Sequence, residues 1–300
     1  MAVVATGFFD GVHLGHRLVI DTLLRAAQAR GEQSVVVTFW PHPRTVLQKD
    51  ARDLRLLTSL SEKREMLSAL GVDRVEVVSF TRDFSRLTAE EYLREWVVGR
   101  FGGTAVVLGY DNRMGSDGLS HDAIVPLAHS LGLDVIECGA VSRIPGTSFG
   151  QAISSTKIRT ALEKGDVAAA ELMLGYRYGL HGVVVAGNHL GRTIGYPTAN
   201  MQLYEPLKLV PANGVYLVEV ETLGRRFHGM TNVGVRPTVS GAGARTIETH
   251  IFDFDELIYG LDISLNFIAK IRDERRFASL DALKGQLSDD EAICRSMLAK

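Results

Sequence analysis

The sequence of 300 residues is poor in cysteine and in net charge. Its two cysteines, Cys138 and Cys294, are too few for a zinc cluster and fit free buried thiols better than a disulfide, which indicates a reducing compartment. The formal net charge is only -2, so the chain lacks the basic surface of a nucleic-acid coat protein or a polybasic membrane binder. No apolar run is long enough to span a bilayer, and the first residues, MAVVATGFFDG, carry no basic leader. We therefore expect a cytoplasmic protein that acts without nucleic acid or membrane.

Length and composition predict two domains. With 46% hydrophobic and 23% charged residues, the chain has ordinary globular composition and is long enough for two modest cores. The first half alternates apolar, strand-like runs with segments of helical periodicity, which is typical of a parallel α/β sheet. These runs are AVVATG at 2–7, QSVVVTF at 33–39, RVEVVSF at 74–80, TAVVLG at 104–109 and LDVIEC at 133–138.

Local signals place several helices. Apolar residues at helical spacing from Leu18 to Ala27 predict a first helix that packs on the sheet, and Gly31 can adopt the left-handed conformation that ends it. Further helices are expected at 120–132, which contains Pro126, and between Gly165 and Gly175. Capping boxes predict three more helix starts, at Ser59 with Glu62, at Thr88 with Glu91 and, near the end of the chain, at Ser288 with Glu291.

The pattern changes to β-structure after His181. Short alternating runs separated by glycine, proline and asparagine are expected of a small antiparallel barrel, and the chain then ends in a helix. We place the boundary near residue 178, which gives domains of 1–178 and 179–300. The barrel runs are GVVVAG at 182–187, GVYLVEVET at 214–222, RFHGMTNVG at 226–234, TIETHIFDF at 246–254 and LDISLNFIAKI at 261–271.

The stretch TGFFDGVHLGH, from Thr6 to His16, lies where the first strand leads into the first helix. Ligands bind parallel sheets at this carboxyl end of a strand, and the amides of a helix N-terminus attract anions. His13 and His16 can stabilise charge that develops on phosphoryl oxygens without serving as bases. Two alternatives stay open: ordinary histidines that cap a helix, and a zinc site, for which the loop offers only Asp10 as a further ligand. The glycines that allow close approach of a ligand are Gly7, Gly11 and Gly15.

The segment ISSTKIR, 153–159, is a second candidate phosphate site. Ser154, Ser155 and Thr156 can cap a helix through their hydroxyl groups. Lys157 and Arg159 can supply positive charge to a triphosphate. A plain helix start rich in serine and threonine is the alternative interpretation.

A third candidate site is GRTIGYPTAN, 191–200. Thr198 and Asn200 offer neutral oxygens two residues apart, and on an extended strand both lie on one face. Such hard oxygens suit Mg²⁺, which offsets charge during transfer of a γ-phosphoryl group to an alcohol. Pro197 fixes the approach of this segment, and the alternative is a glycine-rich hairpin that turns at Tyr196 and Pro197. The glycines that would allow a flap over a nucleotide are Gly187, Gly191 and Gly195.

Transfer to an alcohol also needs a base, because an alcohol is a poor nucleophile until its proton begins to leave. Glu248 in TIETHIFDF lies on a predicted strand, which would aim its carboxylate rigidly. An acidic residue on a barrel strand is more often solvent-facing, and that alternative stays open. The alternation places Glu248, His250 and Phe252 on one face and Ile247, Thr249 and Ile251 on the other.

Several of these blocks together resemble one family. GFFDGVHLGH is similar to the G-x-F-D-G-x-H-x-G-H signature of the HxGH nucleotidyltransferases, which move an adenylyl or cytidylyl group. With ISSTKIR and the segment FWPHP at 39–43, it resembles the adenylyltransferase module of the bacterial bifunctional riboflavin kinase/FAD synthetases. GRTIGYPTAN resembles the riboflavin kinase signature of the same family, and the resemblance extends from Gly7 to about Leu283.

The resemblance implies two reactions on small molecules. Riboflavin and ATP give FMN and ADP in the second domain, and FMN and ATP give FAD and pyrophosphate in a Rossmann-like nucleotidyltransferase domain. Glu248 would be the base for the ribityl hydroxyl, with His250 as a neighbour. His13 and His16 would be catalytic in adenylyl transfer, where the anionic phosphate of FMN needs no base. The expected assembly is a monomer or a weak oligomer.

The resemblance also assigns the residues that bind magnesium, ATP or flavin. Magnesium would be held by Thr198 and Asn200. In the first domain the assigned residues are Gly7, Phe8, Phe9, Asp10, Gly15, Asp111, Asn112, Ser154, Ser155, Thr156, Lys157 and Arg159. In the second domain they are Gly187, Gly191, Arg192, Gly195, Pro197, Thr198, Asn200 and Asn232.

One block departs from the family pattern G-x-D-F-x-F-G. This chain has Asn112 and Met114 at the two aromatic positions, which indicates either a softer wall with the same turn or a weakened adenylyl step. A riboflavin kinase with a degenerate first module is therefore the alternative enzyme. A non-catalytic flavin-binding regulator or storage protein is the alternative from another class, although storage requires neither metal ligands nor a base.

Overall fold

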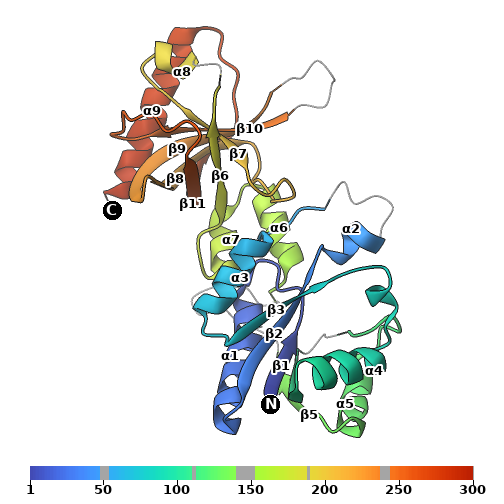
Figure 1. Cartoon of the computed structure of the whole chain (residues 1–300). Coiled ribbons are helices and arrows are strands. Elements are labelled where there is room, and N and C mark those ends of the chain that lie inside the picture. Colours follow the sequence, from blue (N-terminus) through green and yellow to red (C-terminus); the bar gives the residue numbers. More distant parts are fainter. Residues whose placement is uncertain (48–53, 110–112, 140–152, 188–189, 237–243, 300) are drawn as a thin grey trace. The chain divides into compact units, whose positions relative to one another are not determined.

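The computed structural model describes residues 1–47, 54–109, 113–139, 153–187, 190–236 and 244–299. Within these residues the chain forms two compact units, Met1–Ser155 and Thr156–Lys300, each with its own sheet and core (Figure 1). Two predicted binding residues, Asp111 and Asn112, lie outside the described residues.

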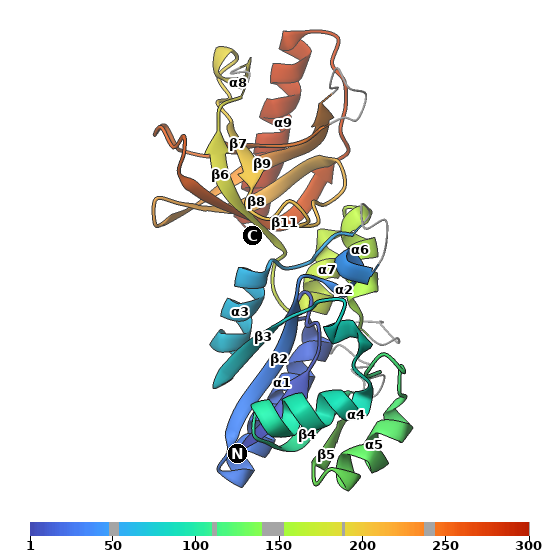
Figure 2. The ribbon, with the colours of Figure 1, turned by 45° about the vertical axis from the view of Figure 1, so that its right-hand side comes forward.

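The first unit is built on a parallel sheet with the strand order β3-β2-β1-β4-β5, which confirms all five predicted strands. Because β1 is central, the loop that follows it opens at the middle of the carboxyl edge of the sheet. Figure 2 labels the two edge strands, β3 and β5. The strands are β1 (Ala2–Thr6), β2 (Gln33–Trp40), β3 (Arg74–Ser79), β4 (Gly103–Gly109) and β5 (Asp134–Cys138). The helical segments are α1 (Leu14–Arg30), α2 (Pro43–Leu47), α3 (Leu60–Ala69), the 3₁₀ turn η1 (Phe84–Arg86), α4 (Ala89–Glu91), the π-helix η2 (Tyr92–Arg100) and α5 (His121–Ser130).

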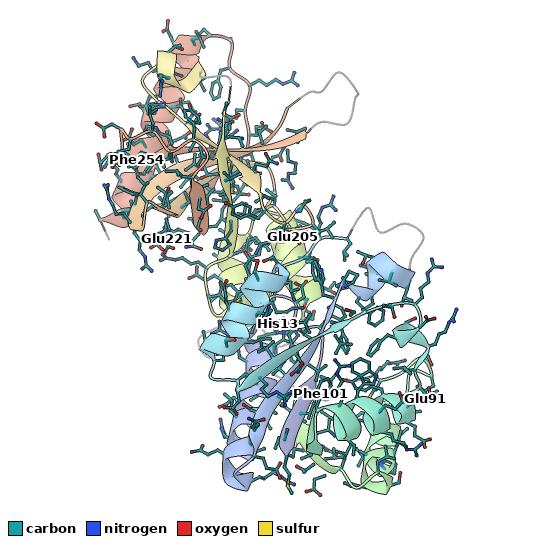
Figure 3. All side chains as sticks on the ribbon, in the orientation of Figure 1. His13, Glu91, Phe101, Glu205, Glu221 and Phe254 are labelled. Carbon is teal, nitrogen blue, oxygen red and sulfur yellow. The ribbon has the colours of Figure 1, made fainter. Side chains whose placement is uncertain are left out.

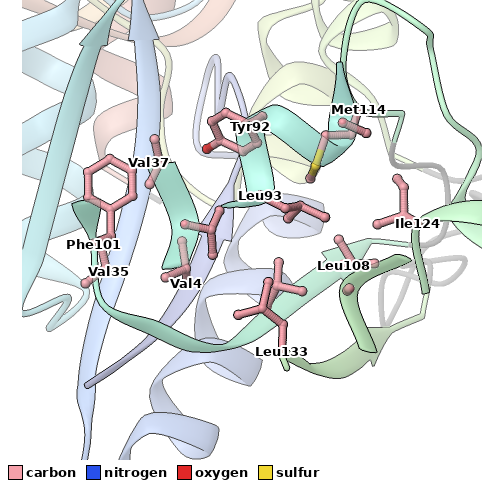
Figure 4. Packing of buried hydrophobic residues seen from close by; sticks show 14 of the residues in the cluster. Val4, Val35, Val37, Tyr92, Leu93, Phe101, Leu108, Met114, Ile124 and Leu133 are labelled. Carbon is pink, nitrogen blue, oxygen red and sulfur yellow. The ribbon is translucent and has the colours of Figure 1, made fainter. Parts of the chain in front are cut away.

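The central strands β1, β2 and β4 are mostly buried on both faces, which is why they read as continuous apolar runs in the sequence, whereas the edge strands β3 and β5 are partly exposed. Val3 and Ala5 of β1 belong to a core that includes apolar residues of α1 and α3. Val4 belongs to the core on the opposite face, and Figure 4 shows Leu93 and Met114 gathered in that core. The predicted parallel α/β fold is therefore confirmed.

Local signals set the helix ends as expected. Helix α1 ends where Gly31 adopts a φ of 63°. Ser59 and Thr88 form the predicted capping boxes of α3 and α4 with Glu62 and Glu91. Helix α5 also forms where a helix was expected.

The second unit contains a closed antiparallel barrel with the strand order β10-β7-β6-β11-β8-β9, which confirms the predicted barrel. Two helices precede the barrel, and the second of them packs on β11. The strands are β6 (Gly179–Val185), β7 (Ala199–Leu203), β8 (Gly214–Thr222), β9 (Arg225–Arg236), β10 (Ala244–Ile251) and β11 (Asp262–Arg272). The helices are α6 (Ser155–Glu163), α7 (Val167–Leu174), α8 (Leu190–Thr193) and α9 (Leu280–Leu298).

The predicted start of the last helix at Ser288 is wrong. Helix α9 begins at Leu280, and the side chain of Ser279 caps it by accepting a hydrogen bond from the amide of Ala282. Ser288 and Glu291 lie inside this helix, where the same three-residue spacing simply places two side chains on one face. A capping-box pattern therefore did not distinguish a helix start from a helix interior.

Helix α9 is anchored to the barrel by charge and by apolar contact. The buried carboxylate of Asp290 pairs with Arg272 of β11 at 2.8 Å. Cys294 is buried in a cluster with Val215 and Phe252. Both cysteines of the chain are buried and free, as predicted.

Candidate active sites

Both histidines of the opening loop lie at the N-terminus of α1. His13 is the N-cap residue, and its Nδ1 accepts the amide hydrogen of His16 at 3.2 Å. The two imidazole rings are stacked with centroids 3.6 Å apart, and Figure 3 labels His13 at this end of the sheet. Because Nδ1 of His13 accepts a hydrogen bond, the neutral ring carries its hydrogen on Nε2, which can donate to a phosphoryl oxygen. His13 thus caps the helix through the nitrogen on the opposite side of the ring from Nε2.

His16 is held in its neutral form. Burial lowers the pKa of its imidazole well below the usual value, and the neighbouring His13 and Lys63 lower the pKa further. Its Nδ1 is buried and has no hydrogen-bond partner among the described residues. At neutral pH this imidazole is therefore suited to donating a hydrogen bond to developing negative charge and not to carrying a proton as an acid.

The backbone of the loop adopts left-handed conformations. Phe9 and Val12 have φ values of 49° and 36°, which residues other than glycine rarely adopt. The buried carboxylate of Asp10 accepts hydrogen bonds from the amides of Leu57 and Thr58, both at 3.0 Å. Asp10 therefore fixes the shape of the loop, and its predicted contact with ATP or flavin stays a prediction.

Ser155 joins the segment ISSTKIR to the loop. Ser155 is the first residue of α6, and its hydroxyl donates to the carbonyl oxygen of Asp10 at 3.0 Å. Ser154 is half-buried directly before this helix. The remaining predicted residues of the segment lie on α6 and are Thr156, Lys157 and Arg159. Of the segment, the structure thus brings Ser155 to the loop.

Next to the loop, the first unit has a cavity of about 530 Å³ whose wall includes several aromatic rings. The rings come from the carboxyl edge of the sheet, since Phe39 lies at the end of β2, Phe80 follows β3 and Phe84 belongs to η1. The hydroxyl groups of Thr6 and Tyr92, which also line the cavity, are 2.9 Å apart. Flat rings around a cavity of this size suit a planar aromatic ligand.

Met114, which stands where the family pattern has an aromatic residue, lies between the core and this cavity. Its side chain is 8% exposed and packs in the core, the residue also lines the cavity, and its backbone forms a bridge with Leu119. Phe80 and Phe84, which the sequence interpretation missed, are among the aromatic residues of the cavity wall. The available signal was their place at and just beyond the carboxyl end of a predicted strand, where ligands bind.

In the second unit, three predicted residues meet on neighbouring strands. The register pairs Glu248 of β10 with Asn200 of β7 on one side and with Asn232 of β9 on the other. Residues directly opposite each other on antiparallel strands point to the same face of the sheet. The structure therefore brings the predicted base, one predicted magnesium ligand and Asn232 together.

The face on which Glu248 lies is the outer face of the barrel. Ile247, Thr249 and Ile251 are at most 5% exposed, as expected for the inner face. Glu248 and His250 are partly exposed and line a cavity of about 330 Å³. The cavity is also lined by residues from the end of β11, the segment that follows it and α9, namely Arg272, Arg275, Phe277, Leu283 and Leu287. Glu248 thus borders this cavity while its side chain stays partly exposed.

Thr198 lies between this cavity and a second one. It lines the cavity of Glu248 and also a cavity of about 320 Å³ that is bounded by Pro197, Arg192 and the loop 254–259. Phe254 of that loop is labelled in Figure 3. His250 donates from Nδ1 to the carbonyl oxygen of Pro197 at 2.8 Å, which ties β10 to the segment that carries Thr198. A residue shared by two cavities is well placed to contact two substrates.

Two of the predicted glycines are required for close packing. A Cβ atom on Gly187 would lie 2.2 Å from Nδ2 of Asn200, and one on Gly191 would lie 2.2 Å from the carbonyl oxygen of Tyr196. Any side chain at these positions would displace the segment or the amide of Asn200. Gly195 has a φ of 87°, which also favours glycine. The glycines thus shape the site, and their predicted role in a flap stays a prediction.

Comparisons with known proteins cover nearly the whole chain. A family model described as FAD synthetase matches residues 1–157, and one described as riboflavin kinase matches residues 174–298. The bifunctional riboflavin kinase/FMN adenylyltransferase of Bacillus subtilis is 36% identical over 97% of this chain and 90% of its own length. The protein of the same name from Escherichia coli K12 is 38% identical over 98% of this chain and 91% of its own length.

A solved structure shows the same fold over nearly the whole chain. It is described as a macrolide-efflux protein from Streptococcus pneumoniae, with 34% identity, a TM-score of 0.90 and coverage of 98% of this chain and 93% of its own. In the described part of the present chain, no helix is both long enough and apolar enough to cross a membrane. The two family matches favour neither an isolated kinase nor a storage protein. The chain belongs to the family of bifunctional riboflavin kinases and FMN adenylyltransferases.

Proposed function

We propose that the second unit of this bifunctional enzyme makes FMN on the outer face of the barrel and that the first unit makes FAD at the H-x-G-H loop. In the first reaction Glu248 accepts the proton of the ribityl hydroxyl while the oxygen attacks the γ-phosphorus of ATP and ADP leaves. The observation that carries this proposal is the register that sets Glu248 between Asn200 and Asn232.

Each of the two cavities of the second unit is assigned one substrate. The cavity of Glu248 has apolar side chains from α9 and a cation, Arg275, which suits the ring system and polar edges of riboflavin. The cavity bounded by residues 254–259 takes ATP. Thr198 lines both, so the γ-phosphate and the ribityl hydroxyl would meet beside it.

Thr198 and Asn200 fit a magnesium ion bound together with phosphate. The described residues contain no group of three or more His, Cys, Asp or Glu that could hold a metal ion by themselves. Neutral oxygens from a hydroxyl and an amide, completed by ATP oxygens and water, are the kind of site that Mg²⁺ accepts. Magnesium bound there would supply charge neutralisation during phosphoryl transfer. The close packing of Asn200 against Gly187 holds the amide in place.

In the first unit, an oxygen of the FMN phosphate attacks the α-phosphorus of ATP, and pyrophosphate leaves. This nucleophile is already an anion, so the site needs hydrogen-bond donors and no base. The Nε2–H groups of His13 and His16 are the proposed donors. The aromatic cavity with Phe80 and Phe84 takes the isoalloxazine ring of FMN.

Product analysis tests the whole proposal. The chain is incubated with riboflavin, ATP and Mg²⁺, and the flavins are separated. FAD as the final product supports two working sites. FMN alone would leave only the kinase, and unchanged riboflavin would contradict both.

We also propose that the enzyme acts in the cytoplasm as a monomer or weak oligomer, with domains of 1–178 and 179–300. Two free buried cysteines suit a reducing compartment. Strand β6 begins at Gly179, which supports this domain limit, whereas the packing of α7 on β11 associates the preceding helices with the barrel.

A further inference from the structure

A buried lysine lies beneath the H-x-G-H loop. Lys63, in the first turn of α3, is only 3% exposed. Its Nζ donates to the carbonyl oxygen of Phe8 at 2.9 Å and lies 5.3 Å from the centre of the Phe8 ring. Lysine is almost never fully buried unless its charge is paired or used.

The fold does not need this lysine to satisfy its neighbours. The carbonyl oxygen of Phe8 also accepts from the hydroxyl of Thr38 at 3.2 Å. The carboxylate of Asp10, which interacts with Lys63 electrostatically, already accepts hydrogen bonds from the amides of Leu57 and Thr58. A methionine of similar length would fill the same space and leave these groups bonded.

Keeping a positive charge here is costly. Burial lowers the pKa of Lys63 to about 8, and the opposing effect of Asp10 is the smaller one. The charge also acts on the site, because Lys63 is one of the groups that lower the pKa of His16. A charge that costs stability and reaches the catalytic pair points to a functional use.

We propose that Lys63 is a positioning residue for adenylyl transfer: its ammonium group fixes the Phe8 carbonyl, and its charge stabilises the departing pyrophosphate. The Phe8 carbonyl immediately precedes Phe9, where the loop turns with a φ of 49°. This inference rests on the adenylyl-transfer site proposed above. Lys63 acts from beneath the loop and does not touch the substrates.

The rate of adenylyl transfer should depend on the charge of Lys63, which several titratable groups surround. The groups that interact with Lys63 electrostatically are Asp10 in the loop and His16 on α1. His13 stacks on His16, and the ring centroids of His42 and Phe8 are 4.3 Å apart. The charge on Lys63 is present below a pH of about 8 and is lost above it. We therefore expect the kcat of adenylyl transfer to fall as the pH rises through about 8, from this cause, and the kinase reaction to lack that limb.

The same shift predicts an unusual effect on stability. The folded chain releases the Lys63 proton at a pKa of about 8, below the ordinary 10.5 of the unfolded chain. The unfolded state therefore binds more protons between these values, and the contribution of Lys63 to the free energy of unfolding rises with pH across that window. At neutral pH, Lys63→Met is expected to leave the melting temperature unchanged or to raise it.

The experiment compares Lys63→Met with Lys63→Arg and with Arg64→Met, which removes an exposed cation from the same helix. Lys63→Met is expected to lower the kcat of FMN adenylylation by about 10- to 100-fold, the size of the loss of one electrostatic group. Its KM values and its riboflavin kinase rate should stay close to those of the wild type. Arginine keeps its charge, so Lys63→Arg should restore much of the rate and move the alkaline limb above pH 8. Arg64→Met should change neither reaction.

Three results would overturn the proposal. They are an unchanged adenylylation rate in Lys63→Met, loss of folding or of both reactions in that variant, and an alkaline limb near pH 8 that persists in both Lys63 variants. The variant His16→Ala tests the proposed adenylyl-transfer site independently of Lys63. If His16→Ala lowers adenylylation and Lys63→Met does not, only the role of Lys63 is wrong. If His16→Ala has no effect, the proposed site itself is wrong.

Discussion

In the first unit the candidate catalytic groups lie on a loop and at a helix N-terminus, whereas in the second unit they lie on neighbouring strands of a barrel. The loop is shaped by left-handed residues and a buried carboxylate, its two imidazoles are stacked, and burial lowers the pKa of His16. The barrel instead sets Glu248 beside Asn200 and Asn232 through strand register. The nucleophiles account for this difference, because a hydroxyl needs a rigidly aimed base and an anionic phosphate needs only donors.

The largest expected effect is the loss of the kinase reaction in Glu248→Gln. The amide keeps the shape of the side chain but cannot accept the ribityl proton, so FMN formation should fall by about 100- to 10,000-fold. Formation of FAD from supplied FMN should stay within about twofold, because no base acts in that site. Both rates are measured on the same preparation by separating the flavins.

Glu221→Gln is the matched control for this variant. Glu221 lies on β8 and pairs with Arg226 at 2.9 Å on the surface, so its loss should change neither reaction. Equal loss of both reactions in Glu248→Gln would show that the two sites are not separate.

The reverse pattern is expected for His16→Ala. Removing one donor to the developing charge should lower FAD formation by about 100-fold, while the riboflavin kinase rate stays unchanged. His129→Ala, on the exposed side of α5, is the control and should resemble the wild type. An adenylylation rate unchanged in His16→Ala would remove His16 from the catalytic groups.

The contrast between the units also explains what the sequence could predict. The sequence revealed the central strands because burial on both faces gives continuous apolar runs in β1, β2 and β4, and it revealed β10 because burial on one face gives alternation. The sequence revealed the H-x-G-H and P-T-A-N segments because the residues that define each of them are neighbours along the chain. The start of α9 was misread because Ser288 and Glu291 show the same pattern inside a helix as they would at its start.

The groups that the sequence did not reveal depend on tertiary structure. Phe84 becomes part of a ligand wall only because η1 lies over the carboxyl edge of the sheet. Lys63 lies on an ordinary-looking helix and is special only because its amine ends under Phe8. Arg275 and Leu287 line the same cavity as Glu248 only because the segment after β11 and α9 return to the barrel. No residue spacing along the chain predicts these three tertiary contacts.

A smaller effect is expected for Gly187→Ala. The new Cβ atom would lie 2.2 Å from Nδ2 of Asn200, the end of a flexible side chain, so the fold should survive while the amide moves. We expect the Mg²⁺ concentration needed for half-maximal kinase rate to rise by roughly tenfold, the usual order for a disturbed metal contact. FAD formation should not change.

Gly285→Ala is the control for this substitution. A Cβ atom there, on α9, meets nothing within 4 Å. An unchanged magnesium requirement in Gly187→Ala would contradict the assignment of Asn200 as a metal ligand.

The smallest expected effect is a pH dependence of stability confined to the first unit. Because the pKa of His16 in the folded chain lies well below the usual 6.5, the unfolded chain binds more protons below pH 6.5, and the free energy of unfolding falls as the pH decreases. The loss should reach about 1 kcal/mol for each pH unit below that value. We would measure it as the temperature at which FAD formation is lost, at pH 7 and at pH 5.5. His16→Ala should weaken this dependence when its unfolding is followed by circular dichroism, and His129→Ala should retain it. A first unit equally stable at both pH values would mean that His16 is not held neutral by the fold.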